Sequence, residues 1–267
     1  MPADDAILFE REGRIAIATL NRPATRNAID AEMADALVAL CQRVDGDLDV
    51  GCVVLASNGP AFCAGGNVKE MYARTGMFSG SAAEMRRAFR SGIQRVPLAF
   101  RALEVPVVAV VGGPAVGAGF DLALMCDIRI AAAEATFAES FIRLGLVSGD
   151  GGAWLLQRVA GISRAYQMTL TGEVISASQA EQWGIVSAVH PAGRLLAEAL
   201  AIARKIVAHP PHSIRLNKRL LRDAEQSNLA QNLELAAALQ AIVLHTDDLR
   251  EGVAAVVEKR AATFTGH

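Results

Sequence analysis

Residues 107–127, VVAVVGGPAVGAGFDLALMCD, lead from a strand through a glycine-rich turn into a helix. The first five residues are all apolar, which is typical of a strand that is covered on both faces. A turn with four glycines follows, and an apolar helical run begins after it. The last N–H groups of the turn therefore lie at the positive end of a helix dipole, where they can bind a negative oxygen. This stretch predicts a βα unit with a backbone site for an anion.

A second strand that is followed by small residues comes earlier in the chain. Residues 52–56 (CVVLA) are apolar throughout, and residues 61–67 (AFCAGGN) contain small side chains that let a backbone approach a ligand closely. Each of the two turns offers one N–H donor for an oxyanion. Either turn alone is weak evidence, because glycine-rich turns between strand and helix are common. Together they favour an anion site built from two turns.

The remainder of the first 190 residues also alternates strand and helix signals. Residues 15–20 (IAIATL) have the composition of a strand, and Asp30 is placed to cap a helix over 31–44. Further strands are predicted at 128–131 and 185–189. This alternation is typical of an α/β fold in which helices cover a sheet.

The C-terminal quarter follows a different pattern. From residue 193 the spacing predicts helices at 195–208, 213–223, 229–245 and 249–259, with hardly a strand signal between them. The sequence therefore divides into a core at 1–192 and a helical region at 193–267. Residues 68–97 interrupt the alternation of the core as a long polar insertion with partial helix.

Composition limits the classes of function. The chain has 267 residues, of which 52% are hydrophobic and 20% charged, and its net charge is −2; these values fit one large domain with an extension. No basic stripe points to nucleic acid, and no long apolar run points to a membrane span or a leader. We expect a cytoplasmic protein. Its four cysteines lack metal-ligand spacing, so buried free thiols are expected and no metal site.

Three other catalytic patterns do not fit the chain. Gly117-Ala118-Gly119 begins a dinucleotide-binding GxGxxG motif, but Leu122 occupies its last glycine position. The phosphate-binding motif GxxxxGK[ST] is absent. The GxSxG motif of many serine hydrolases is absent too, and all five histidines follow residue 189.

An ordered series of motifs covers almost the whole chain. It consists of NRPATRNA at 21–28, FCAGGN at 62–67, GAGFDLALMCD at 117–127, LGL at 144–146, GDGG at 149–152, LTG at 170–172, AEQWGIV at 180–186 and VEKR at 257–260. Together these motifs resemble the enoyl-CoA hydratase/isomerase family, the crotonase superfamily. The resemblance implies a crotonase-like (ClpP/crotonase) α/β spiral of ββα units. It also implies that the C-terminal helical region mediates trimers, which often pair into hexamers.

The resemblance further implies an acyl-CoA thioester as substrate. By position, the N–H groups of Gly66 and Ala118 hold the thioester oxygen, and preorganised donors of this kind contribute about 3 to 4 kcal/mol each. Coenzyme A is part of the substrate, so the resemblance implies no separate cofactor and no metal. The expected partners are this thioester and further copies of the chain, as a homotrimer or a dimer of trimers.

Positions that match the CoA-binding segments of the family are spread along the chain. Arg26 and Ala28 match residues of the nucleotide and pantetheine channel, and the backbone of Ala64 matches a contact to adenine. Lys259 resembles a phosphate contact from a neighbouring subunit. For Arg26 and Lys259, a solvated surface charge is an equally good interpretation. The predicted substrate contacts also include Gly65, Asn67, Val68, Gly117 and Phe141.

The acid/base residues depart from the family pattern. Hydratases of the family place two glutamates beside the double bond; here Asp121 matches the first position and Phe141 the second. Asp150 is a second candidate, because the same loop supplies an aspartate in some isomerases and dehalogenases, one position earlier. A helix N-cap or a turn aspartate explains Asp150 equally well, and a buried, hydrogen-bonded helix residue is the alternative for Asp121. Glu139 would point to the same side as Phe141 if that stretch were extended.

The sequence therefore predicts an enzyme that stabilises a thioester enolate, with Asp121 and Asp150 moving protons or positioning water. An enoyl-CoA hydratase that acts on a 2-enoyl-CoA is the leading function. A double-bond isomerase is the chemical alternative, because it needs only one base. The alternative from another class is a CoA-binding homologue with little catalysis. Aromatic and methionine side chains, Met71 and Phe141 among them, form either an acyl pocket or core.

Overall fold

The structure, a computed structural model, describes residues 5–267, whose strands form two sheets. In the larger sheet β1 is antiparallel to β2, and every other pair of neighbours is parallel. Its order is β1 (Ile7–Glu12), β2 (Ile15–Leu20), β3 (Cys52–Ser57), β4 (Val107–Val111), β6 (Ile128–Ala132) and β9 (Ala188–His190).

The smaller sheet gives the fold its repeating unit. It contains β5 (Ala115–Val116), β7 (Thr136–Ala138) and β8 (Val174–Ser176), and an isolated bridge pairs Cys63 with Ala115. Each of the strands β3, β4 and β6 of the larger sheet is therefore followed by a segment that belongs to the smaller sheet or forms a bridge to it. A helix follows each of these pairs, which agrees with the predicted ββα repeat.

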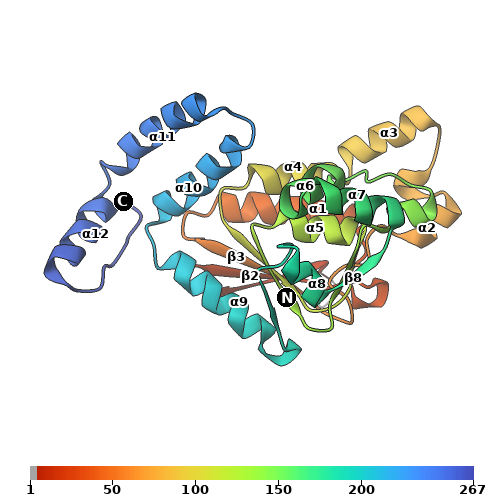
Figure 1. The fold of residues 1–267 in the computed structure, drawn as a ribbon, viewed down its shortest axis with the longest axis horizontal. Coiled ribbons are helices and arrows are strands. Elements are labelled where there is room, and N and C mark those ends of the chain that lie inside the picture. The colour runs from red at the N-terminus through yellow and green to blue at the C-terminus, as the bar shows by residue number, and fades with distance from the viewer. Residues whose placement is uncertain (1–4) are drawn as a thin grey trace.

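Helices lie on both sides of the larger sheet, as Figure 1 shows, with α1, α4 and α5 on one side and α9 on the other. None of the helices in residues 5–267 combines the length and apolarity that a membrane crossing requires. The helices are η1 (Pro23–Thr25), α1 (Ala31–Asp45), α2 (Val68–Ala73), η2 (Gly76–Phe78), α3 (Ala82–Ser91), α4 (Arg95–Ala102), α5 (Ala118–Met125), η3 (Ser140–Leu144), α6 (Gly152–Ala160), α7 (Ile162–Thr171), α8 (Ala177–Gln182), α9 (Ala192–Val207), α10 (Pro211–Ala224), α11 (Leu229–Val243) and α12 (Asp247–Glu258).

The core lies between the sheet and these helices. Every residue of β4 is buried, as are the first four of β3, which explains why both strands are continuously apolar. Phe120 and Phe137 are fully buried, and their rings pack against each other at a tilt, with centroids 5.6 Å apart. All four cysteines are buried and free, as the sequence analysis expected.

Two segments differ from the sequence-based predictions. The strand expected at 185–189 is β9, Ala188–His190; Ile185 and Val186 are buried in the turn before it, so their apolar character reflects core packing. The insertion at 68–97 is more ordered than expected, because it contains α2, η2, α3 and the start of α4. Ser81 and Glu84 form a capping box that begins α3.

The C-terminal helices differ in what they contact. Helix α9 packs against β2, β3, β4 and β6, whereas α11 and α12 lie away from the sheet (Figure 1). The domain boundary at residue 193 stays a prediction. The long helices that were expected from periodicity are present, with ends shifted by a few residues.

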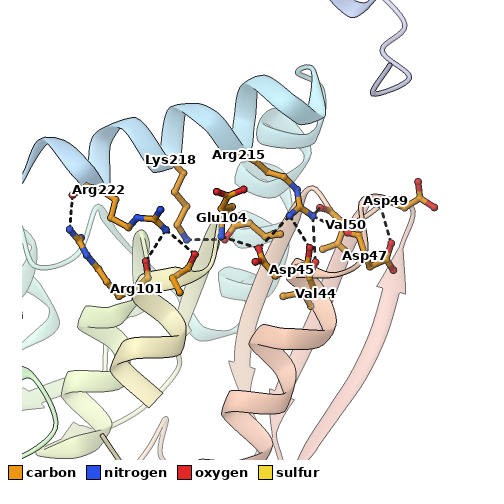
Figure 2. A network of polar contacts seen from close by, with 12 residues as sticks. Val44, Asp45, Asp47, Asp49, Val50, Arg101, Glu104, Arg215, Lys218 and Arg222 are labelled. Carbon is orange, nitrogen blue, oxygen red and sulfur yellow. Dashed lines mark hydrogen bonds and ion pairs between the residues drawn. The ribbon is translucent and has the colours of Figure 1, made fainter. Parts of the chain in front are cut away.

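Three basic side chains hold α10 against the core, as Figure 2 shows. Arg215, Lys218 and Arg222 lie at intervals of three and four residues, so they share one face of the helix. Each donates to backbone carbonyls of the core: Arg215 to Val44, Asp45, Asp47 and Val50, Lys218 to Val105, and Arg222 to Arg101 and Ala102. Lys218 also forms an ion pair with Asp127 at 2.7 Å.

Replacement of Arg215 by methionine is expected to lower the free energy of unfolding by about 2 to 4 kcal/mol. Arg215 is 8% exposed, and its loss would leave several buried carbonyl oxygens unpaired, each of which costs about 1 to 3 kcal/mol before relaxation. Urea unfolding at fixed protein concentration measures the change. The matched control is Arg219→Met on the same helix, where an exposed i,i+4 ion pair with Asp223 at 3.6 Å is lost; here a change of about 0.5 kcal/mol or less is expected. Equal losses in the two variants would contradict the role given to Arg215.

Candidate active site

Two backbone N–H groups, those of Gly66 and Ala118, are free to bind an oxygen atom. Within residues 5–267 neither donates a hydrogen bond to the chain, although N–H groups beside them do. Ala64 N–H donates to Arg26 O at 2.9 Å, and Gly117 N–H donates to Ala138 O at 2.8 Å. Ala118 is the first residue of α5, so its N–H has no partner within the helix and lies at the positive end of the dipole.

Glycines let the two turns that carry these donors touch. Gly65 has φ +88°, and a Cβ atom there would lie 2.5 Å from Val116 O and 3.4 Å from Ala118 N. A Cβ on Gly119 would lie 2.1 Å from Cys63 O. No side chain fits at either position, so the turns at 61–67 and 112–121, which the sequence treats as a pair, are held in direct contact.

Gly117 sets the direction in which α5 begins. Its backbone, with φ +53° and ψ −124°, adopts a conformation that is open to glycine and strained for other residues. The ring of Phe141 lies 3.6 Å from the place that a Cβ of Gly117 would occupy. Phe141 is in the 3-10 helix η3 and is half-buried. An apolar ring therefore borders the turn from which the Ala118 N–H projects.

Three buried carboxylates meet one turn into α5. Asp121, Glu139 and Asp150 are 0%, 1% and 3% exposed. A Cβ on Gly152 would lie 2.2 Å from Asp121 Oδ1 and 2.5 Å from Glu139 Oε1, so both carboxylates approach the same glycine. In residues 5–267, no group of three or more His, Cys, Asp or Glu side chains has an arrangement that suits a metal ion.

The polar groups around this carboxylate cluster are few. Gly152 N–H donates to Asp121 Oδ2 at 3.0 Å, and the Ser148 hydroxyl donates to the same oxygen at 3.4 Å. Gly152 is the first residue of α6, so Asp121 also faces the positive end of that helix. Among the described residues, Asp121 Oδ1, both oxygens of Glu139 and Asp150 Oδ1 have no donor. A contact between two of these carboxylates becomes a hydrogen bond only when one of them carries a proton.

Burial raises the pKa of all three carboxyl groups. For Asp121 the cause is first burial and then the charges of Asp150 and Glu139, which together hold its pKa well above its usual range. Burial also raises the pKa of Glu139, to about 7, although its contact with Asp121 works in the opposite direction. The pKa of Asp150 is raised, chiefly by burial. The cluster therefore retains protons at neutral pH, which lets it act as both acid and base.

The structure excludes one interpretation of Asp150 and adds one to Asp121. Gly151 is the N-cap of α6, and the first N–H groups of this helix donate to Asp121 and to the Ser148 hydroxyl, so the interpretation of Asp150 as an N-cap is wrong. Asp121 is indeed a buried, hydrogen-bonded helix residue, and it is also the centre of the carboxylate cluster. The structure brings the predicted residues Asp121 and Asp150 together, and their catalytic roles stay predictions; Glu139 was not among the predicted site residues. Its position two residues before Phe141 was the available signal.

The predicted CoA-binding segment at 26–28 lies beside the turn at 61–67. Arg26 is exposed, with φ +54°, and its carbonyl oxygen accepts from Ala64. Ala28 is 9% exposed, and the next residue, Ile29, donates to Gly65 O at 2.8 Å. Asn27, which was not predicted, is fully buried, and its amide donates to the carbonyl oxygens of Asn58, Ala61 and Phe62. Asn27 thereby fixes one segment against the other.

Residues 67–71 place a short helix over Gly66. The side chain of Asn67 caps α2 by accepting from the N–H groups of Lys69 and Glu70, and Val68 is 55% exposed. The terminal methyl of Met71 lies 2.7 Å from the place that a Cβ of Gly66 would occupy. Met71, which the sequence assigned to an acyl pocket or to core, therefore lies directly against a predicted oxyanion donor.

Lys259 is not brought to the other predicted residues within one chain. It is exposed at the end of α12, and Figure 1 shows α12 at one end of the molecule, well away from α5. The contact that was expected from a neighbouring subunit stays a prediction.

Comparison with known proteins identifies the family to which the chain belongs. Residues 10–267 match the sequence model of the enoyl-CoA hydratase/isomerase family. The chain belongs to this family. Among similar members of the enoyl-CoA hydratase/isomerase family, a probable enoyl-CoA hydratase of Mycobacterium tuberculosis is 36% identical over 98% of each chain. The 1,2-epoxyphenylacetyl-CoA isomerase of Escherichia coli is 35% identical over 97% of this chain and 98% of that one.

Solved structures of the enoyl-CoA hydratase/isomerase family share the fold. Enoyl-CoA hydratase from Bacillus anthracis superposes with a TM-score of 0.92 at 30% identity, over 98% of this chain and 100% of that one. The enoyl-CoA hydratase of Mycobacterium smegmatis gives a TM-score of 0.90 at 34% identity, over 97% and 98%. These matches confirm the predicted crotonase-like α/β fold.

Proposed function

We propose that the protein is an acyl-CoA enzyme that holds a thioester enolate at the N–H groups of Gly66 and Ala118, and that it hydrates a 2-enoyl-CoA. The observation that carries the proposal is the pair of unpartnered N–H groups one turn from the buried carboxylate of Asp121. Negative charge develops on the thioester oxygen when water adds to the double bond, and fixed donors stabilise that charge. The names of the relatives support hydration.

The proposed chemistry uses groups that the chain itself supplies. Water adds its oxygen to the β-carbon, its proton passes to an ionised carboxylate, and the electron pair of the double bond moves onto the thioester oxygen. The enolate then takes a proton at the α-carbon from a carboxylic acid, and Asp121 and Asp150 are the predicted carriers. These steps need no metal or separate cofactor, because the thioester activates its own double bond.

A double-bond isomerase is the second candidate, and Phe141 favours it. An aromatic ring at this position holds no proton and no water, while moving a double bond needs only one base that carries a proton between the α- and γ-carbons. One similar relative is named as an isomerase. The candidate from another class, a CoA-binding homologue with little catalysis, predicts acyl-CoA binding without turnover.

Incubation with a panel of 2-enoyl-CoA and 3-enoyl-CoA thioesters in deuterated water separates these functions. We expect a product that is heavier by one heavy water, with deuterium on the α-carbon, and mass spectrometry detects it. An unchanged skeleton with a moved double bond would establish the isomerase instead. Tight binding without turnover across all chain lengths would leave the CoA-binding role.

Assembly and location are part of the proposal. We propose a homotrimer, or a dimer of trimers, in which α10, α11 and α12 bury apolar surface between subunits. These helices line a groove of about 510 Å³, and large apolar side chains stand exposed on the last two: Leu229, Leu233, Ile242, Val253, Val256 and Val257. A monomer in sedimentation equilibrium at micromolar concentration would contradict the assembly. The cytoplasmic location draws support from four buried free thiols.

A further inference from the structure

The residue at position 141, where the family pattern has a second glutamate, is a phenylalanine, so a hydratase of this sequence needs a second proton carrier from another position. The carrier has to lie within reach of Asp121 and of the oxyanion donors. The side chain of Glu139 contacts Asp121, and its backbone lies beside the turn that carries the Ala118 N–H. The peptide before it is fixed to the site, because Ala138 O accepts from Gly117 N–H at 2.8 Å.

The side chain of Glu139 is directed at Asp121 and not at solvent. It is 1% exposed, and its polar contacts within residues 5–267 are the side chains of Asp121 and Ser148. Its Oε1 and the Oδ1 of Asp121 both lie within 2.5 Å of the point where a Cβ of Gly152 would be. Two buried carboxylates this close cannot both be ionised without a high cost, whereas one shared proton turns their contact into a hydrogen bond.

We propose that Glu139 is the second acid/base group of this site and that it shares a single proton with Asp121. The inference rests on the proposed function. The shared proton can lie on either member of the pair. Asp121 accepts from Gly152 N–H and the Ser148 hydroxyl and faces the N-terminus of α6, so these groups stabilise the form in which Asp121 carries the negative charge and Glu139 the proton, and hydration starts from this form.

The shared proton accounts for both proton transfers of hydration. Ionised Asp121 takes the proton of the attacking water as the C–O bond forms at the β-carbon. Protonated Glu139 gives its proton to the α-carbon as the enolate collapses. The pair ends with one proton, now on Asp121, and a transfer across the contact to Glu139 restores the starting state without solvent.

Two other ionisable groups, Asp150 and Cys63, lie near the pair. Asp150, from the loop before α6, is the third member of the cluster, and it raises the pKa of Asp121 and of Glu139. The Cys63 thiol is also fully buried, and burial raises its pKa to about 12, so it stays neutral. Asp150 is therefore the one competing proton partner that the described residues supply, and the test includes it.

The test is the pH profile of kcat for the 2-enoyl-CoA of the panel that reacts fastest, in wild type, Glu139→Gln and Asp150→Asn. A pair that must hold one proton gives a bell-shaped profile, because activity falls when both members are protonated and when both are ionised. We expect Glu139→Gln to lower kcat by about 10²- to 10⁴-fold, to leave KM within a few-fold, and to abolish the high-pH fall. Glu134→Gln is the matched control, since Glu134 is exposed in the turn before β7, and it should keep the full bell.

A second readout does not depend on turnover. A carboxyl with a raised pKa keeps a proton in the folded protein that the unfolded chain has released, so stability falls as pH rises from the usual glutamate pKa through about 7. Glu139→Gln should flatten this part of the stability curve, while Glu134→Gln should not change it. If the wild-type enzyme turns over no thioester but Glu139→Gln still flattens the stability curve, the proposed function is overturned and the shared proton is not. Two results with an active wild type would overturn this inference. In the first, Glu139→Gln keeps both the bell-shaped pH profile of kcat and the wild-type pH dependence of stability. In the second, the fall at high pH is lost only in Asp150→Asn.

Discussion

Replacement of Ala118 by proline is expected to lower kcat/KM for the thioester by at least about 10³-fold, because removal of one oxyanion donor costs about 10²- to 10³-fold and the ring adds a steric block. Proline has no N–H, and its Cδ would occupy the place where the thioester oxygen binds. The fold should tolerate it, since Ala118 is the first residue of α5, a position that suits proline. Steady-state kinetics with the best substrate of the panel measures the loss.

The matched control for this variant is a proline at another helix start. Ala82 is the first residue of α3, it is exposed, and the residue before it, Ser81, is extended with ψ 164°. Ala82→Pro should therefore keep both activity and stability. Thermal unfolding establishes that the two variants fold. An active Ala118→Pro enzyme would mean that the Ala118 N–H does not hold the reacting oxygen.

Replacement of Asp121 by asparagine is expected to lower kcat by about 10²- to 10⁴-fold while acyl-CoA binding is kept. The amide oxygen can still accept from Gly152 N–H, but the amide cannot take the proton of water. The same variant should be more stable than wild type above neutral pH, since it removes a charge from a cluster in which burial raises every carboxyl pKa.

Calorimetric titration with acyl-CoA and urea unfolding at pH 8 provide the two further measurements for Asp121→Asn. A lower kcat together with a higher stability in Asp121→Asn would indicate that the buried charge is needed for the reaction and not for folding. Asp49→Asn, which changes an exposed aspartate, is the control for the loss of one negative charge. Unchanged turnover in Asp121→Asn would favour the CoA-binding role, in which no carboxylate has to move a proton.

The sequence predicts the fold of this molecule better than it predicts the acid/base chemistry. Continuous apolar runs identify β3 and β4 because both strands are covered on two faces. Glycines at 65 and 119 identify the contact between the two turns, since no Cβ fits there. Strand β1 and the true position of β9 were missed, because β1 is apolar only in its first half and has no buried residue, and the residues before β9 are buried in a turn.

The carboxylate cluster illustrates what a sequence leaves open. Asp121, Glu139 and Asp150 lie in three separate segments, and only tertiary packing shows that Glu139 and Asp150 both contact Asp121. The expectation that Glu139 points with Phe141 assumed an extended stretch, whereas Phe141 lies in the 3-10 helix η3. That turn separates the two side chains, so that Phe141 packs near Gly117 and Glu139 faces Asp121.

The most direct test of the enolate site is exchange of the α-protons of a saturated thioester, butyryl-CoA, in deuterated water. Exchange requires an enolate but neither water addition nor a double bond, so it examines the two N–H donors whichever reaction the enzyme performs. We predict that mass spectrometry finds deuterium at the α-carbon with wild type and Ala82→Pro, and none above the buffer rate with Ala118→Pro. Exchange at the buffer rate with wild type, under conditions in which the thioester is bound, would contradict an enolate held at Gly66 and Ala118.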